Sequence, residues 1–123
     1  MNKKRVLVAD DETGILRFVK INLSMAGYEV FTTTSGEEAL KLVDSVKPDV
    51  MLLDILMTPF SGFEVLAKLR PASQLPVIVF TAKSDFGERA LKEGADDYIA
   101  KPFLPDQLLK KIENVLNNQP LNS

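Results

Sequence analysis

Short apolar runs alternate regularly with amphipathic stretches along this chain, and this alternation limits the folds that it can adopt. The runs are mostly continuous and rich in Val, Ile and Leu, which is typical of strands buried on both faces of a sheet. They lie at Val6–Ala9, Tyr28–Phe31, Val50–Leu53, Val77–Phe80 and Tyr98–Ala100. Strands that alternate with helices form parallel sheets through right-handed crossovers. The pattern therefore predicts an α/β fold with helices on both faces of one sheet.

Apolar residues at helical spacing occupy the connecting stretches. The stripes are Ile15-Val19-Leu23-Ala26, Ala39-Leu40-Val43, Val65-Leu66-Leu69 and Leu108-Leu109-Ile112-Val115-Leu116, with a weaker one at Ala90-Leu91. Ser35 and Glu38 have the spacing of a capping box, and Pro105 suits the first position of a helix. Gly27 and Gly94 stand where helix ends favour a positive φ. For five such strands we expect the flavodoxin-like, doubly wound (βα)5 arrangement with strand order 2-1-3-4-5.

The chain contains no histidine and no cysteine among its 123 residues. These absences exclude a Ser-His-Asp triad, an imidazole base, a thiolate metal site and a cysteine nucleophile. Any chemistry must use carboxylates, hydroxyls, lysines, backbone groups and a hard metal ion. The length is that of one domain, which we place at residues 1–118, with residues 119–123 as a flexible tail or the start of a linker.

Charge and hydropathy argue against several classes of function and location. Fifteen basic and seventeen acidic side chains give a net charge of −2, which offers no support for nucleic-acid binding by this segment. No apolar run is long enough to span a membrane. The first apolar run is short and is followed at once by acids, unlike a signal peptide. We therefore expect a cytoplasmic domain with no membrane partner.

Polar side chains follow all five apolar runs. Those after the second run, threonines and Ser35, suit a turn and a helix cap, whereas those after the other four have complementary chemistry. In the expected strand order, the first and third strands are neighbours at the point where ligands bind, so Asp10, Asp11 and Asp54 should meet there. Three unpaired carboxylates repel one another, and a divalent cation together with Lys101 would relieve this repulsion. An all-oxygen site with room for water suits Mg²⁺. Thr81 adds a hydroxyl donor at the end of the fourth strand.

This combination indicates phosphoryl transfer. A carboxylate can attack phosphorus and form an acyl phosphate, while a cation, a lysine and a hydroxyl neutralise the phosphoryl oxygens. Asp54 is the expected nucleophile because it is the lone acid at the end of the central strand. Each residue taken alone has an ordinary interpretation, such as helix capping by residues 10–12, a turn at Asp54 or a solvated Lys101. The functional interpretation depends on their coincidence at one edge of the sheet.

The sequence closely resembles the receiver domains of two-component response regulators, over residues 5 to about 116. The segments that carry this resemblance are Val8–Glu12, Pro48–Ile55, Gly62, Pro76–Ala82, Gly94–Tyr98 and Lys101–Phe103. The resemblance implies a phosphorylation-activated switch rather than a metabolic enzyme, one that catalyses only its own phosphorylation and dephosphorylation. Its phosphodonor would be a phosphohistidine on a sensor histidine kinase.

The resemblance also implies roles for individual residues. Asp54 would accept the phosphoryl group, and Lys101 would contact the phosphoryl oxygens. Asp10 or Asp11, with Asp54 and the backbone carbonyl of Leu56, would hold Mg²⁺ or Mn²⁺; in the family the second acid of the pair is the more direct ligand.

Further implications concern the switch and the partners. Thr81 would move toward the phosphoryl group and Tyr98 would swing inward behind it. This shift would remodel the face built from the fourth helix, fifth strand and fifth helix, to control an effector protein or a C-terminal output domain. Arg89, Asp96, Asp97 and Lys111 resemble charged residues that pair receivers of winged-helix regulators, so a homodimer through that face is possible. The Lys101–Pro102 peptide bond is expected to be cis.

Three departures from the family pattern stand out. The proline expected four positions after Asp54 is displaced by one, giving Thr58-Pro59 and an altered turn. The stretch from Thr81 to Gly94 is a couple of residues short, which leaves the fourth helix truncated or displaced. Leu56, two positions after Asp54, cannot orient an attacking water, so we expect slow self-dephosphorylation.

Several alternatives stay open. The chain could be a complete single-domain regulator or the receiver of a longer protein. A phosphatase of the haloacid dehalogenase type also uses an aspartyl nucleophile, but it requires a second aspartate at the position of Leu56. An interaction scaffold that keeps the fold without switching is a third class. A flavin-binding module would need a phosphate-binding loop after the first strand, and no such loop is evident.

Overall fold

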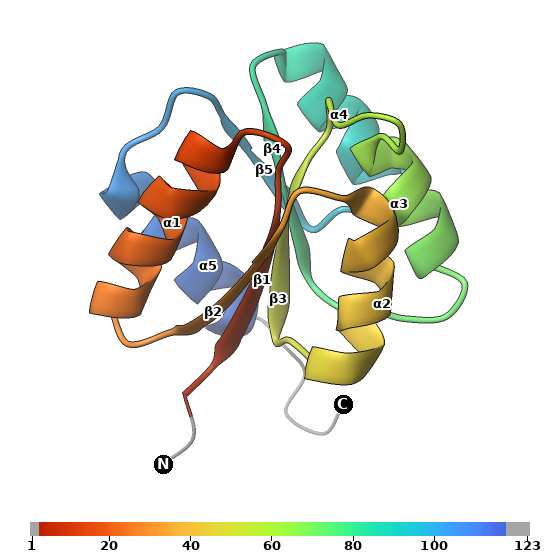
Figure 1. The fold of residues 1–123 in the computed structure, drawn as a ribbon. Helices are drawn as coiled ribbons and strands as arrows, with labels where there is room; N and C mark the ends of the chain where they lie inside the picture. Colours follow the sequence, from red (N-terminus) through yellow and green to blue (C-terminus); the bar gives the residue numbers. More distant parts are fainter. Residues whose placement is uncertain (1–2, 118–123) are drawn as a thin grey trace.

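The computed structural model describes residues 3–117 as five parallel strands alternating with five helices (Figure 1). The strands are β1 (Arg5–Ala9), β2 (Glu29–Thr33), β3 (Val50–Asp54), β4 (Val77–Thr81) and β5 (Asp97–Ala100). The helices are α1 (Thr13–Met25), α2 (Gly36–Val46), α3 (Gly62–Leu69), α4 (Ser84–Lys92) and α5 (Pro105–Asn117). The sheet order is β2-β1-β3-β4-β5, which confirms the predicted architecture. Residues 119–123, expected to be a tail, lie outside the described part.

Two apolar clusters fill the spaces between the sheet and its helices. Alternate residues of β1 face opposite sides, so Leu7 joins one cluster and Val6 the other. Helices α2, α3 and α4 cover the first cluster, and α1 and α5 cover the second (Figure 1). Strands β1, β3 and β4 are almost wholly buried, which explains their continuous apolar sequences.

The turn and capping signals are largely confirmed. Gly27 and Gly94 have φ values of 99° and 111°, and Pro105 opens α5. The stripe predicted on α1 needs a correction. Leu16 is buried with Val19 and Leu23, whereas Ala26 is exposed because the helix ends at Met25.

The capping box at the start of α2 is only half formed. Ser35 Oγ accepts a hydrogen bond from the Glu38 N–H at 3.1 Å, as predicted. The Glu38 carboxylate does not return to the Ser35 N–H but accepts from the Thr33 hydroxyl. The Ser35 N–H donates to Thr33 Oγ1 at 3.1 Å instead. A threonine at the end of β2 thus satisfies both groups.

The two regions in which the sequence departs from the family pattern form a short helix and a turn with a cis peptide bond. The short stretch after Thr81 accommodates a nine-residue α4 that packs against β4 and β5. The altered turn at Thr58-Pro59 contains a cis peptide bond, and the Lys101–Pro102 bond is cis as expected. No helix within residues 3–117 is long and apolar enough to cross a membrane.

Candidate functional site

Three carboxylates gather at the carboxyl edge of the two central strands. Asp10 directly follows β1 and Asp54 ends β3, and these strands pair in register up to Ala9 and Leu53. One carboxylate oxygen from each of Asp10, Asp11 and Asp54 lies within 4.8 Å of the others. Asp10 and Asp54 are buried, whereas Asp11 is exposed. The strand order therefore brings together the three acids that the sequence predicted to meet.

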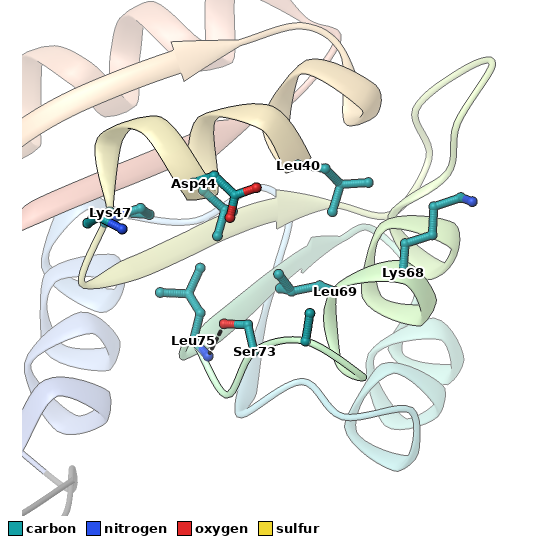
Figure 2. A pocket seen from close by; sticks show the side chains of 10 residues that line it. Leu40, Asp44, Lys47, Lys68, Leu69, Ser73 and Leu75 are labelled. Carbon is teal, nitrogen blue, oxygen red and sulfur yellow. Dashed lines mark hydrogen bonds between the residues drawn. The ribbon is translucent and has the colours of Figure 1, made fainter.

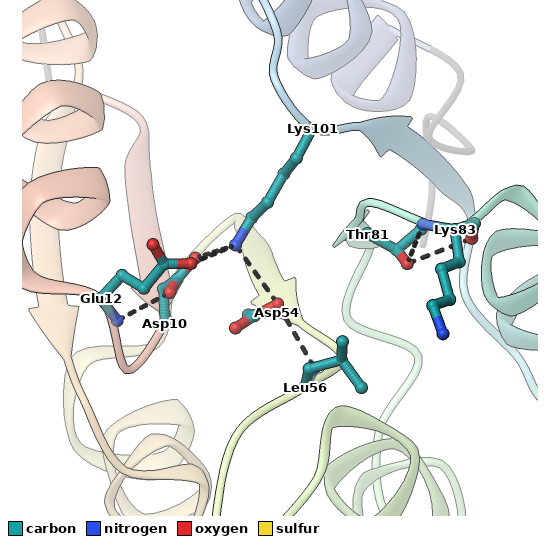
Figure 3. A network of polar contacts seen from close by, with 7 residues as sticks. All are labelled: Asp10, Glu12, Asp54, Leu56, Thr81, Lys83 and Lys101. Carbon is teal, nitrogen blue, oxygen red and sulfur yellow. Dashed lines mark hydrogen bonds and ion pairs between the residues drawn. The ribbon is translucent and has the colours of Figure 1, made fainter.

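Lys101 reaches this cluster from the end of β5 (Figure 3). Its Nζ lies 2.8 Å from Asp10 Oδ2 and 3.4 Å from Asp54 Oδ1. Glu12 Oε1 lies 3.4 Å from the same ammonium. The ammonium is therefore shared among three carboxylates and compensates part of their charge.

The electrostatics of the cluster follow from this packing. Burial raises the pKa of Asp54 from 3.8 to about 6, and the charge of Asp10 adds to the increase, although Lys101 and the Leu56 N–H act against it. Burial alone would lower the pKa of Lys101, but the hydrogen bond and charge of Asp10, followed by the charges of Asp54 and Glu12, raise it overall. Lys101 is therefore charged near neutral pH, and Asp54 is costly to ionise.

The donor set fits a hard divalent cation. Two buried and one exposed carboxylate offer three oxygens close together, and the exposed side leaves space for water ligands. One ammonium does not neutralise the acids that surround it, so net negative charge remains to attract a cation. Asp10, Asp11 and Asp54 could hold such an ion.

Thr81 and Leu56 make specific contacts at the rim of the cluster. Thr81 Oγ1 donates to the Lys83 carbonyl at 3.1 Å and accepts from the Lys83 N–H at 3.0 Å. The hydroxyl that we expected beside the carboxylates is therefore bonded to the backbone of the residue just before α4, and it lies apart from Asp54 (Figure 3). The Leu56 N–H donates to Asp54 Oδ1 at 3.3 Å, and its side chain is exposed.

Tyr98 lies on β5 against α4 and is partly buried. A Cβ atom added at Gly87 of α4 would lie 2.4 Å from the Tyr98 ring, so the glycine provides the space in which the ring sits. Sequence reasoning identified Tyr98 but missed Gly87. It also missed Glu12 as a partner of Lys101, since residue 12 was interpreted only as part of a strand-end acid run.

A separate hollow, which shares no lining residue with the carboxylate cluster, lies between α2 and α3 (Figure 2). Leu40, Leu69 and Leu75 line it, with Lys68 at its edge. The Lys68 ammonium lies 5.6 Å from the centre of the Phe60 ring. No converging polar groups comparable with those around Lys101 are found there, so the carboxylate cluster is the stronger candidate.

Comparisons with known proteins agree on one family. The family model described as "Response regulator receiver domain" matches residues 6–113. The "Probable transcriptional regulator ycf27" of Cyanophora paradoxa is 43% identical over 118 residues, covering 94% of this chain and 49% of that protein. The "Alkaline phosphatase synthesis transcriptional regulatory protein PhoP" of Bacillus subtilis is 38% identical, covering 98% of this chain and 51% of that protein. The chain thus spans about half the length of these curated relatives.

Solved structures give the same result. The chemotaxis response regulator CheY4 of Vibrio cholerae superposes with a TM-score of 0.87 at 33% identity, covering 94% of this chain and 100% of that one. A Francisella response regulator receiver domain also reaches a TM-score of 0.87, at 32% identity, covering 94% of this chain and 98% of that one.

Proposed function

The chain belongs to the response regulator receiver domain family, and from this premise we propose that Asp54 accepts a phosphoryl group and thereby switches the domain. The observation that carries the proposal is the position of Asp54 at the end of β3. There it is buried among Asp10, Asp11 and the Lys101 ammonium, which lies 3.4 Å away. The role is regulatory rather than metabolic, and the cation is Mg²⁺ or Mn²⁺, held by these acids and the Leu56 carbonyl.

The chemistry is the transfer of one phosphoryl group from a phosphohistidine of a sensor histidine kinase. A carboxylate oxygen of Asp54 forms a bond to phosphorus as the phosphorus–nitrogen bond breaks, and the imidazole leaves with the electron pair and takes up a proton. Lys101 shifts from its acidic partners to the new phosphoryl oxygens. A bound divalent cation supplies further neutralisation of those oxygens.

The switch begins when Thr81 turns toward the phosphoryl group. To do so, its hydroxyl must give up both hydrogen bonds to Lys83, the residue immediately before α4. The phosphoryl group therefore has different contacts in the two states, as any population shift requires. Tyr98 then moves inward, and the face built from α4, β5 and α5 changes shape.

We propose an effector protein or an output domain as the reader of this face, with residues 1–118 forming the receiver. A homodimer would form through the same face. The charged residues of that face already have partners within the chain: Arg89 pairs with Glu93, Lys111 with Asp97, and Asp96 with Arg70. A dimer that used these charges would have to exchange intramolecular pairs for intermolecular ones.

The test is incubation of the protein with Mg²⁺ and acetyl phosphate, followed by intact-mass measurement. The wild type should gain one phosphoryl mass in the presence of Mg²⁺. It should gain none when Mg²⁺ is chelated before the donor is added, and Asp54→Asn should gain none in either case. Asp44→Asn, an exposed acid on α2, should behave like the wild type. Absence of the added mass in the wild type would favour a scaffold, whereas continuous phosphate release from monoesters would favour a phosphatase.

A further inference from the structure

The β3–α3 loop, residues 55–61, borders the carboxylate cluster, and its middle part is held without hydrogen bonds. Near its start, the Leu56 N–H donates to Asp54 Oδ1 at 3.3 Å (Figure 3). At its end, the Gly62 N–H donates to the Ile55 carbonyl at 2.9 Å. Residues 57–60 make no hydrogen bond with any residue in the described part of the chain. The conformation of this middle part therefore depends on how its side chains pack.

Two side chains anchor the middle of the loop. Met57 is only 3% exposed and belongs to the apolar cluster that α2, α3 and α4 cover. Phe60 is half-buried and packs against the same cluster, and the Lys68 ammonium lies over its ring. Met57 thus fixes the half of the loop next to β3, and Phe60 fixes the half next to α3.

The first residue of α2, Gly36, allows the loop to approach this closely. A Cβ atom added at Gly36 would lie 3.1 Å from the Phe60 carbonyl oxygen and 3.2 Å from Phe60 Cβ. It would also lie 2.9 Å from a methyl group of Val65. Gly36 does not have a positive φ, so the backbone conformation does not require a glycine. Its missing side chain instead provides the space against which Phe60 sits.

We propose that Phe60, seated against Gly36, is a positioning residue for cation binding and phosphoryl transfer at Asp54. The proposal rests on the proposed function of Asp54, and Phe60 acts through Leu56. The Leu56 N–H orients the Asp54 carboxylate, and the Leu56 carbonyl is the backbone ligand proposed for the cation. A backbone group can be placed only by placing the chain, so the anchor at Phe60 decides how well both groups of Leu56 are preorganised.

The experiment measures the Kd of Mg²⁺ without any phosphodonor, from the amide NMR signals of Asp10 and Asp11 during a titration. In Phe60→Ala the Kd should rise about ten-fold, as is typical when a group that orients a metal ligand is removed. Phe60→Leu, which keeps an apolar anchor, should restore most of the affinity. Gly36→Ala leaves Phe60 intact but pushes it away, so it should also raise the Kd. The Mg²⁺ concentration that gives half the maximal rate with acetyl phosphate should rise by the same factor in each variant.

Two matched controls separate positioning from a general loss of packing. Phe31 is also half-buried and packs against the same cluster, but it lies on β2. Phe31→Ala should lower the melting temperature and leave the Kd of Mg²⁺ unchanged. Gly14→Ala places a methyl group in the first turn of another helix, where it would meet nothing within 4 Å. It should leave both quantities unchanged or raise the melting temperature slightly.

A wild-type Kd in both Phe60→Ala and Gly36→Ala would overturn the proposal. An equal rise in Phe31→Ala would overturn it too, because any loss of packing would then weaken the site, and so would a wild type that binds no Mg²⁺. If Phe60→Ala does not fold, Phe60→Leu and Gly36→Ala decide the matter. A wild type that binds Mg²⁺ but gains no phosphoryl group would reject the proposed function of Asp54, and the Kd comparison would still decide the role of Phe60.

Discussion

At the residue scale, Asp54 combines two demands that oppose each other. Burial favours its neutral form, whereas nucleophilic attack requires the carboxylate. Because its pKa rises from 3.8 unfolded to about 6 folded, the metal-free native state binds more protons than the unfolded state between these values. The contribution of Asp54 to stability is therefore most favourable at low pH and declines as pH rises through about 6.

Replacing the Asp54 carboxyl with a neutral amide should remove the loss of stability that its ionisation causes. We expect Asp54→Asn to raise the free energy of unfolding by about 1–3 kcal/mol at pH 7 without metal, and by much less at pH 4. Chemical denaturation at the two pH values measures the difference, with the exposed Asp44→Asn as the control. A gain of equal size at both pH values would show that the carboxyl of Asp54 is not the group that titrates.

Leu56 leads us to expect a slow loss of the phosphoryl group from Asp54. Its side chain is 55% exposed beside Asp54, and it has no polar atom with which to orient a water for attack on an acyl phosphate. We expect the phosphorylated protein to persist well beyond seconds, and Leu56→Asn to shorten its lifetime several-fold. The decay of the phosphoryl mass after donor removal measures both. A wild-type lifetime of seconds would contradict this interpretation.

At the scale of elements, Gly87 decides how closely α4 can approach β5. A methyl group there would lie 2.4–2.6 Å from three atoms of the Tyr98 ring. Gly87→Ala should therefore displace the ring toward solvent and destabilise the fold by about 1–2 kcal/mol, despite the better helix propensity of alanine. Thermal denaturation and the NMR signals of the Tyr98 ring report the two effects.

Gly14 offers a matched control for this prediction. It also lies near the start of a helix, but a Cβ atom there would meet nothing within 4 Å. Gly14→Ala should be neutral or slightly stabilising and should leave the Tyr98 signals unchanged. Equal stabilities for the two variants would mean that the ring yields without cost.

The strands could be predicted from the sequence, whereas several hydrogen bonds at the ends of the strands and helices could not. Apolar runs predicted all five strands, and they are continuous in β1, β3 and β4 because these strands are buried on both faces. Hydrogen bonds made across a turn were less predictable. The Glu38 carboxylate turned to Thr33 instead of Ser35, since a hydroxyl two residues before the cap competes for it. The Thr81 hydroxyl likewise found its partner in the backbone of Lys83, a local contact that residue types alone do not distinguish from an active-site role.

At the scale of the whole molecule, strand order assembles the site. Residues 10, 54 and 101 are far apart in the chain but meet because the carboxyl ends of parallel strands share one edge. That juxtaposition was predictable from the alternation of strands and helices. The sharing of Lys101 among three carboxylates, including Glu12, was not, because it depends on how far an exposed side chain reaches.

Because the three carboxylates offer a binding site for a cation, we expect the free energy of unfolding to depend on the metal. Cation binding to the native state should raise the free energy of unfolding by about 3 kcal/mol when Mg²⁺ exceeds its Kd a hundredfold. Melting curves with and without Mg²⁺ should show this shift for the wild type and for Asp44→Asn. Asp10→Asn and Asp54→Asn should reduce it. A shift of the same size in all four proteins would place the cation elsewhere.

Mapping the phosphoryl group onto the sequence shows whether a carboxylate oxygen of Asp54 forms the new bond to phosphorus. Borohydride converts an aspartyl phosphate to homoserine, so the modified position survives digestion and can be read by tandem mass spectrometry. After treatment with acetyl phosphate and Mg²⁺, homoserine should appear at position 54 and at no other aspartate. Homoserine at position 10 or 11, or modification that persists in Asp54→Asn, would mean that another carboxylate is the phosphoacceptor.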